Sequence, residues 1–401
     1  MKKFRIALYI LIPIFTILAS GIYCYYSFII CDAEILDGKP VENVITFRDS
    51  VIDPSRVTQV FDSIITRSFD SIGMVGAAVA VVKDGRIELL KPMGVRKFGT
   101  SDSVDIHTIF RVASVSKGFA GILGGILNNN HTLCLDDKVA DYLPDFKLKS
   151  DKATKSISLR NVLSQSTGLE AHAYDNFLNQ SMPYDYIYKN LNKLNMCGEP
   201  GKYYGYQNVI YSLYDPVVEK KTNISYAQLL RDSLFRPLHM DDASTGFEAF
   251  CRNENIAYPH KRNRTLYISQ ELNPRYYSAL PAAGVNASIS DMSKWLMAMM
   301  GNNETVINKD VLDTVFTPRI ETRLKRGYFG YWQGLQSRFY GLGWMVLCYK
   351  GNQIIYHRGF IDGYKAEIAF CREKNVGIVY LTNSPNCETY NWIPLFFDMY
   401  L

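Results

Sequence analysis

The sequence predicts an α+β fold in which strands from both ends of the chain form one antiparallel sheet, flanked by helices, with an all-helical domain inserted between them. Two short strands near the start, helical spacing in the middle and a return to strands at the end indicate this arrangement. The chain has 401 residues, of which 47% are apolar and 21% are charged. That composition supports a sizeable core and excludes a disordered or fibrous protein.

The globular domain, which we place at residues 51–401, is expected to begin with a helix and a hairpin. Asp53 and Pro54 are typical of a helix start, and apolar residues at helical spacing follow them: Val57, Val60, Phe61, Ile64 and Ile65. Two strands, 75–82 and 86–91, flank Asp84 and Gly85, a residue pair typical of tight hairpin turns.

The helical insertion is expected at about residues 118–280, with apolar faces such as Ile122, Leu123, Ile126 and Leu127. Four short apolar runs bounded by turn residues then predict strands at 343–349, 353–357, 365–371 and 376–382. A final helix is expected at 392–401. A sheet and a helical lobe arranged in this way would place a small-molecule site between them.

The N-terminus carries a membrane signal. The chain begins with three basic residues, Lys2, Lys3 and Arg5. No charged residue follows them until Asp32. This uncharged run is longer than the roughly 20 residues that a helix needs to cross a bilayer. We therefore expect residues 1–32 to anchor the chain in the cell membrane, 33–50 to be a linker, and the globular domain to lie in the periplasm or outside the cell. The alternative is a secreted protein with a cleaved signal, because Ala-Ser-Gly at 19–21 resembles a cleavage site.

Charge and metal-ligand patterns exclude several classes of function. The 44 basic and 39 acidic residues give a dispersed net charge of +5, without the basic face that nucleic-acid binding needs. The six histidines are scattered, and the six cysteines beyond residue 32 lack metal-ligand spacing. No H-E-x-x-H or phosphate-binding glycine motif is present. We therefore expect no metal, no cofactor and no disulfide.

The segment Ser114-Val-Ser-Lys117 is the strongest chemical signal in the chain. At the start of a helix this spacing places the serine and the lysine on one face. A serine hydroxyl needs a base to become a nucleophile, and a lysine can serve when burial or nearby positive charge lowers its pKa. The backbone N–H of Ser114 is also placed to donate to an oxyanion. The alternative is an exposed lysine beside a helix-capping serine, because chance matches are common.

Three segments carry a resemblance to a known family. Thr108–Lys117 resembles the nucleophile segment of the serine β-lactamase and penicillin-binding superfamily, in the branch of class C β-lactamases, DD-peptidases and related esterases. Arg160–Leu169 resembles its conserved loop, with Gln165 where a histidine is common, and Tyr340–Trp344 is similar to a recurrent segment. The resemblance runs from about residue 53 to 401. It implies a β-lactamase/DD-peptidase-like fold and a serine hydrolase without a cofactor.

The second motif of that family is Tyr-x-Asn. In it the tyrosine acts as a general base together with the lysine, and the amide of the asparagine orients the substrate. Three segments match it: 174–176, 188–190 and 206–208. Glu-Pro-Gly at 199–201 and an apolar helix after it favour Tyr206 and Asn208. The resemblance implies that Tyr206 acts as a base, and a nearby ammonium would hold its phenolate ionised. The alternative is a core tyrosine with its hydroxyl satisfied.

The third motif is Lys-x-Gly or His-x-Gly on a strand, which His357-Arg358-Gly359 matches after an apolar run. Lys325-Arg-Gly327 competes with it, in a charged and irregular stretch. A glycine at 359 would let the substrate backbone approach the strand. By resemblance, the N–H of Phe360 is a second oxyanion donor. Arg358 replaces the usual small hydroxyl residue, and it either binds a substrate carboxylate or points outward.

The resemblance implies two-step acyl transfer: the serine attacks a carbonyl, and water then releases the acyl group. We expect a membrane-anchored serine hydrolase of small amides or esters, first of all DD-peptidase-like or penicillin-binding-like. Carboxylesterase ranks second and β-lactamase third, because class C β-lactamases mostly carry lysine where this chain has His357. The expected partner is a small molecule or peptide, such as a cell-wall fragment, rather than nucleic acid. The alternative is a tethered protein that binds such fragments without turnover.

Overall fold

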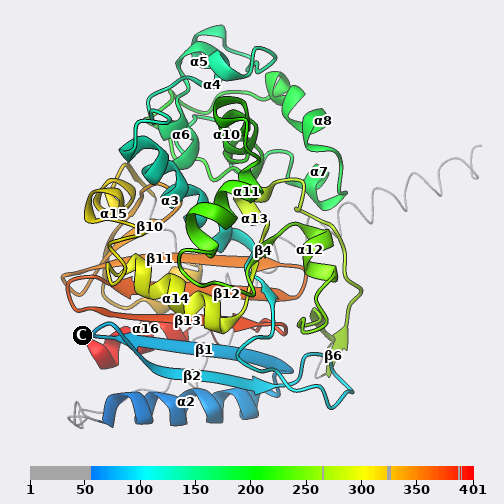
Figure 1. Ribbon diagram of the computed structural model, residues 1–401, viewed down its shortest axis with the longest axis vertical. Coiled ribbons are helices and arrows are strands. Elements are labelled where there is room, and N and C mark those ends of the chain that lie inside the picture. Colours follow the sequence, from blue (N-terminus) through cyan, green and yellow to red (C-terminus); the bar gives the residue numbers. More distant parts are fainter. Residues whose placement is uncertain (1–55, 264–265, 323–326, 387–388, 390) are drawn as a thin grey trace, which may run out of the picture. The chain divides into compact units, whose positions relative to one another are not determined.

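The computed structural model describes residues 56–263, 266–322, 327–386, 389 and 391–401 (Figure 1). One compact unit consists of Asp53–Arg323 and Gly334–Leu401. In the other unit, the described residues include the 3₁₀-helix η5, Gly327–Tyr331. The expected anchor, linker and helix start at 53–54 lie outside the described residues. Within the described part of the chain, no helix combines the length and the apolar character needed to cross a membrane.

An eight-stranded antiparallel sheet forms the larger unit's framework, in the order β2-β1-β13-β12-β11-β10-β9-β8 (Figure 1). Its strands are β1 Gly76–Lys83, β2 Arg86–Gly94, β8 Ile320–Glu321, β9 Leu335–Tyr340, β10 Met345–Tyr349, β11 Asn352–Ile361, β12 Tyr364–Cys371 and β13 Val376–Thr382. β1 pairs with β13, with Ala77 opposite Thr382 and Lys83 opposite Val376. The first hairpin and the last strands therefore share one sheet, which confirms the predicted α+β fold.

Helices cover both faces of the sheet. Alternate β1 residues on one face, such as Ala78 and Ala80, belong to a large core that continues into the helical region. Helix α14, Ile289–Met299, packs against β1 and β13. The terminal helices α2, Val57–Ile72, and α16, Trp392–Tyr400, pack together, with the rings of Phe61 and Phe396 5.4 Å apart. Because both faces are covered, β1 is buried from Gly76 to Val82.

Most of the regular elements between β2 and β9 are helices. They are α3 Ser116–Asn129, α4 Val139–Tyr142, α5 Asp151–Ser156, α6 Leu159–Leu163, α7 Asp175–Asn179, α8 Tyr184–Lys189, α9 Asn208–Tyr211, α10 Tyr214–Thr222, α11 Tyr226–Leu230, α12 Phe247–Cys251, α13 Leu280–Ala283, α14 and α15 Lys309–Phe316. Short 3₁₀ and π turns complete them: η2 Ala113–Val115, η3 Leu191–Lys193 and η4 Arg231–Phe235.

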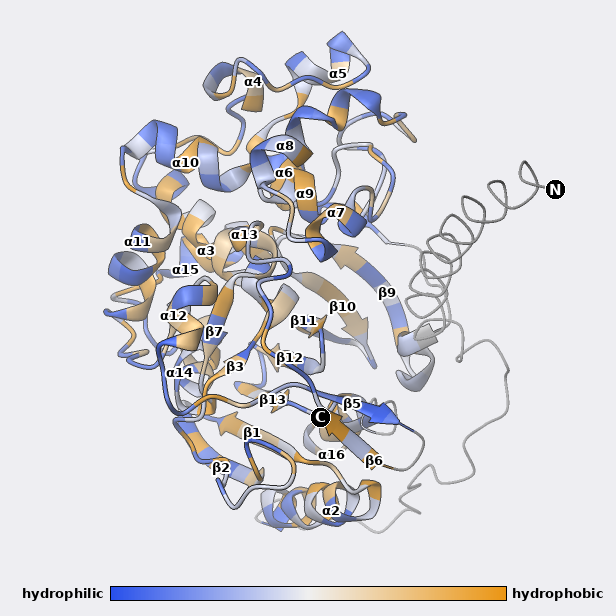
Figure 2. Cartoon of the chain, turned by 90° about the vertical axis from the view of Figure 1, so that its right-hand side faces the viewer, coloured by the Kyte–Doolittle hydropathy of each residue, from blue (hydrophilic) through white to orange (hydrophobic). Residues whose placement is uncertain are grey.

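Short strands also occur within the expected insertion, 118–280. The hairpin of β5, His260–Asn263, and β6, Leu266–Ser269, has a largely hydrophilic and a largely hydrophobic strand (Figure 2). A small sheet joins β3 Phe110–Arg111, β7 Val285–Ala287 and β4 Ser244–Thr245. The insertion is therefore helical with added short strands rather than exclusively helical. The reason is local: in β6 a buried Tyr267 alternates with exposed Leu266 and Ile268.

The predicted strands and the final helix are present, with small shifts at their ends. Asp84 and Gly85 have φ of 51° and 73°, as a tight hairpin turn requires. β11 continues past its predicted end at His357 as far as Ile361, so the third motif lies within a strand. Helices α14 and α15 lie beyond the predicted end of the helical region at about 280, and strands β8 and β9 were not predicted either.

Candidate active site

Ser114 lies in the turn η2, where the chain passes from β3 into helix α3. Ala113 has a left-handed φ of 48°, which bends the chain sharply just before the serine. Arg111 fixes the approach to this turn: its buried guanidinium donates to the carbonyl oxygens of Asn273 at 3.3 Å and Arg275 at 2.6 Å. The predicted nucleophile segment is therefore a turn that the hydrogen bonds of Arg111 hold in place, and Ser114 is half-buried at its tip.

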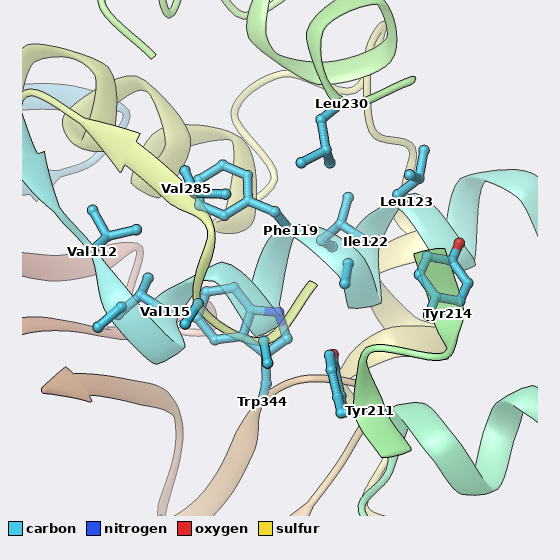
Figure 3. Close-up of a cluster of buried hydrophobic side chains, with 14 of the residues drawn as sticks. Val112, Val115, Phe119, Ile122, Leu123, Tyr211, Tyr214, Leu230, Val285 and Trp344 are labelled. Atoms are coloured by element: carbon cyan, nitrogen blue, oxygen red, sulfur yellow. The ribbon is translucent and has the colours of Figure 1, made fainter. Parts of the chain in front are cut away.

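Helix α3 is enclosed by apolar side chains (Figure 3). The segment Tyr340–Trp344 packs directly against it. A Cβ added at Gly121 would lie 1.9 Å from the carbonyl oxygen of Leu342, and one at Gly343 would lie 2.1 Å from that of Lys117. Glycine is needed at both positions because the two backbones meet there. This segment, recognised by resemblance, therefore holds the helix that carries the lysine.

Lys117 is the most constrained charged group of the site. Its Nζ lies 3.2 Å from Ser114 Oγ and donates to Asn208 Oδ1 at 2.7 Å and to the carbonyl of Ala282 at 3.0 Å. The side chain is fully buried. Burial lowers the pKa of Lys117 to about 7, although the negative charge of Asp175 raises it in part. The alternative of an exposed lysine is therefore wrong, and the amine is placed to accept the serine proton.

Tyr206 contacts both Lys117 and Ser114. The Lys117 Nζ lies 4.7 Å from the centre of its ring, and its hydroxyl hydrogen-bonds with the Ser114 side chain. Burial raises the pKa of Tyr206 well above its ordinary value, more than the bond with Ser114 and the charge of Arg358 lower it. The expected phenolate is therefore wrong: loss of water disfavours the charged phenolate more strongly than the neighbouring groups favour it.

Asn208 links Lys117 to a carboxylate that the sequence analysis missed. Its Oδ1 accepts from Lys117, and its Nδ2 donates to the Oδ1 and Oδ2 of Asp175 at 3.0 and 2.9 Å. Asp175 is buried, and His172 Nδ1 lies 2.9 Å from its Oδ2. The His172 ring lies against Tyr206, with centroids 5.3 Å apart. Asp175 belongs to a Tyr-x-Asn match that we rejected, and no local signal links it to Asn208.

The loop Arg160–Leu169 supports the same segment. Gln165 has a left-handed φ of 57°, and its Oε1 accepts from the backbone N–H of Gln207 at 2.7 Å. The backbone N–H of Gly205 donates to the carbonyl of Gln165 at 3.0 Å. Glutamine therefore takes the place of the histidine common in related proteins, and it holds the residue between Tyr206 and Asn208.

His357 faces the site from β11 as a neutral ring. Burial, with a further contribution from the charge of Lys117, lowers the pKa of His357 to about 3. Its Nδ1 donates to the carbonyl of Arg358 at 2.8 Å, so Nε2 accepts from the hydroxyl of Tyr340 at 3.0 Å. The Tyr340 ring in turn contacts that of Tyr206, with centroids 6.4 Å apart. Both ring nitrogens of His357 are thus engaged by the protein itself.

Gly359 brings β11 against the serine turn. A Cβ at this position would lie 2.3 Å from the carbonyl oxygen of Val112 and 2.7 Å from the nitrogen of Ser114. We expected this glycine to make room for a substrate backbone, but the space beside it is taken by the protein's own serine turn. Phe360 follows with a half-exposed side chain. The two expected oxyanion donors therefore belong to adjoining segments. The competing residues Lys325 and Arg326 lie outside the described part of the chain.

Arg358 occupies the other face of β11. It pairs in register with Glu367, and strand alternation therefore turns it away from the face of His357. The side chain is half-buried. Burial lowers the pKa of Arg338, and the charge of Arg358 adds to that effect. Burial raises the pKa of Tyr204, and the charge of Arg338 opposes that rise. The guanidinium of Arg358 thus acts electrostatically on Tyr206, which bonds with Ser114, and that of Arg338 acts on Tyr204.

Comparisons with known proteins match most of the chain. A sequence model described as Beta-lactamase matches residues 61–390. Protein flp of Staphylococcus aureus (strain MRSA252) is 22% identical over 339 residues, covering 81% of this chain and 62% of that protein. The Unguisins hydrolase ungD' of Aspergillus campestris (strain IBT 28561) is 23% identical over 342 residues, covering 83% of this chain and 62% of the relative. The chain thus spans less than two thirds of the length of these relatives.

A solved structure shows the same fold. The octameric penicillin-binding protein homologue from Pyrococcus abyssi superposes with a TM-score of 0.73 and 19% sequence identity, covering 85% of this chain and 77% of that chain. At this identity the likeness shows the fold alone. The sequence match spans most of the chain, and together the two findings support a serine hydrolase of the β-lactamase and penicillin-binding type. The chain belongs to the β-lactamase family.

Proposed function

We propose that the chain is a membrane-anchored, extracytoplasmic hydrolase that forms an acyl-enzyme on Ser114 and acts like a DD-peptidase or penicillin-binding protein. The observation that carries this proposal is the buried Lys117 amine, 3.2 Å from Ser114 Oγ and with a pKa of about 7. A base with a pKa near the working pH is suited to general-base catalysis at neutral pH. The uncharged run before Asp32 supports the anchor.

The reaction follows from these positions. The neutral Lys117 amine takes the proton of Ser114 as its Oγ bonds to the substrate carbonyl carbon. The backbone N–H groups of Ser114 and Phe360 donate to the oxyanion. The Tyr206 phenol gives its proton to the leaving group and regains one from the Lys117 ammonium. Water, with its proton accepted by the same amine, then adds to the acyl carbon and restores the serine.

Charge favours a peptide with a free terminal carboxylate as substrate. The positive charge of Arg358 acts on Tyr206, whose hydroxyl bonds with Ser114, and that of Arg338 acts on the neighbouring Tyr204. Guanidinium groups near a site favour anionic ligands, and a terminal carboxylate is such a group. A carboxylesterase is the second candidate, because the neutral His357 replaces the lysine that class C β-lactamases mostly carry.

Covalent labelling of the full-length chain tests the proposal. We would measure the intact mass after treatment with a penicillin and, separately, with a fluorophosphonate, with Ser114→Ala as the control. Adducts with both reagents that are absent from the variant support a penicillin-binding peptidase. Labelling by the fluorophosphonate alone favours the carboxylesterase. If neither reagent forms an adduct, the acyl-enzyme is excluded, and the alternative of a protein that binds cell-wall fragments without turnover is favoured.

Two further measurements test the finer points of the proposal. Hydrolysis of a peptide that ends in D-Ala-D-Ala is expected to exceed that of its C-terminal amide, because the amide lacks the carboxylate. Equal rates would contradict the role assigned to the two arginines.

N-terminal sequencing tests the anchor. The mature protein is expected to begin before residue 19, and a start at residues 20–22 would show a cleaved signal instead.

A further inference from the structure

We propose that Asp175 is a positioning residue of this site: its carboxylate fixes the orientation of the Asn208 amide and supplies the negative charge that balances Lys117. The proposal rests on the function given above, in which Lys117 is the base. Asp175 lies on α7 and Asn208 on α9, and the two residues are separated by more than 30 positions in the sequence. The carboxylate touches no reacting atom and acts through Asn208.

The hydrogen bonds of Asn208 allow one orientation of its amide. Its Nδ2 donates to both oxygens of Asp175, at 3.0 and 2.9 Å, and its Oδ1 accepts from Lys117 at 2.7 Å. A flipped amide would place its carbonyl oxygen against the carboxylate and its NH₂ against the Lys117 donor, which is unfavourable at both ends. The Asn208 NH₂ is therefore engaged by Asp175 before any substrate arrives. Lys117 in turn is held toward Ser114.

The segment that carries Asp175 is fastened to the segment that carries Asn208. The backbone N–H of His172 donates to the carbonyl of Tyr206 at 2.7 Å. The side chain of Gln207 donates to the carbonyls of Glu170 at 3.0 Å and Ala173 at 3.2 Å. The His172 imidazole occupies Asp175 Oδ2 at 2.9 Å. These bonds hold the carboxylate in place independently of its contact with Asn208.

Burial makes the charge of Asp175 effective. Its side chain is only 9% exposed, so solvent screens it weakly. It raises the pKa of Lys117 against the effect of burial, and it adds to the rise that burial causes in the pKa of Tyr276. Around Lys117 and Asp175, His357, Tyr206, Tyr211 and Tyr276 are uncharged near pH 7, because burial lowers the pKa of the histidine and raises the pKa of each tyrosine. His172 is half-exposed, and Arg358, whose charge acts on His357 and Tyr206, is a cation. The anion that faces Lys117 among these groups is Asp175.

The test is the pH dependence of Ser114 labelling by a fluorophosphonate in the full-length chain. Asp175→Asn keeps the size of the side chain and removes its charge. The acidic limb of the pH–rate profile, where the labelling rate falls as Lys117 becomes protonated, should therefore move about one pH unit lower. The plateau should also fall about tenfold, because Asn208 loses its fixed orientation. Asp175→Glu keeps the charge and changes the geometry. Its plateau should fall while its acidic limb stays in place.

A merely structural role would lower the labelled fraction without moving the limb. The matched control is Asp291→Asn, a buried carboxylate in the capping box of α14, which should lower stability and leave the limb unchanged. An unmoved limb in Asp175→Asn, or a wild-type plateau in both Asp175 variants, would overturn the proposal. Absence of labelling in the wild-type chain would instead contradict the proposed function, so the two failures can be told apart.

Discussion

The buried amine of Lys117 makes the reactivity of Ser114 depend on pH. Its pKa of about 7 means that the amine is an ammonium below that pH and a neutral base above it. The rate of fluorophosphonate labelling should therefore fall about tenfold for each pH unit below 7 and level off above it. Lys117→Met, of similar length but without a proton acceptor, should lose at least about 100-fold at pH 8. A rate that stays constant between pH 5 and 8 would refute this assignment.

Gly359 is a second residue with a defined structural requirement. The Cβ of Gly359→Ala would meet the nitrogen of Ser114 at 2.7 Å, and the serine turn must move to relieve the contact. Displacement of about 1 Å can cost about 100-fold in rate, so labelling of Ser114 should fall by about that factor. Gly330→Ala is the control, since an added Cβ there meets nothing within 4 Å. A variant with a wild-type rate would show that the turn is free to shift.

How far single residues can be predicted from sequence depends on whether their partners are local. Ser114 and Lys117 are neighbours on one helix turn, and their spacing gives the contact directly. Tyr206 and His357 come from motifs that a family resemblance supplies. The role of Asp175 depends on the packing of α7 against α9, which no short spacing encodes. The state of Tyr206 was also missed, because its charge is decided by burial, which a sequence motif does not show.

At the scale of elements, helix α3 and the segment Tyr340–Trp344 depend on each other. In Gly121→Ala the added Cβ would lie 1.9 Å from a backbone oxygen, which no change of rotamer can relieve. We expect a loss of about 1–3 kcal/mol in the free energy of unfolding, measured with urea. Gly125→Ala on the same helix is the matched control. Its nearest contact is the side-chain Cγ2 of Val315 at 2.8 Å, so its loss should be smaller. The reverse order would contradict this packing.

The elements that the sequence predicts well are those with continuous burial or a plain turn. β1 and β13 are largely apolar runs buried on both faces, and β12 is buried throughout although it contains Lys365 and Glu367; each begins or ends within a residue of its predicted bounds. β9 has no such pattern, because most of its residues are only partly buried and Tyr340 alone in this strand is fully buried. α14 did carry a signal: Ser288 and Asp291 form a capping box at its start. This helix was not predicted, because the helical region was expected to end before it, at about residue 280.

At the scale of the whole molecule, the site is assembled from both ends of the chain. Ser114 and Lys117 follow the first hairpin, whereas His357 and Gly359 lie on β11 near the end. The pairing of β1 with β13 joins these parts in one sheet. The order of all eight strands could not be predicted from sequence, since each strand pattern reports burial and not its neighbour. The resemblance, rather than the patterns, is what implied that the three motifs meet.

This topology predicts that a substitution between α2 and α16, away from the core around α3, lowers stability without changing the reactivity of Ser114. Phe396 is fully buried between α16 and α2, away from the core that encloses α3. Phe396→Ala should lower the free energy of unfolding by about 3–5 kcal/mol, because it leaves a cavity. The rate of Ser114 labelling should stay unchanged wherever the variant is folded. Phe98→Ala, at a half-exposed position, should change stability by less than about 0.5 kcal/mol. Urea unfolding followed by circular dichroism and by labelling checks both expectations, and a labelling loss that precedes unfolding would show that the two faces are coupled.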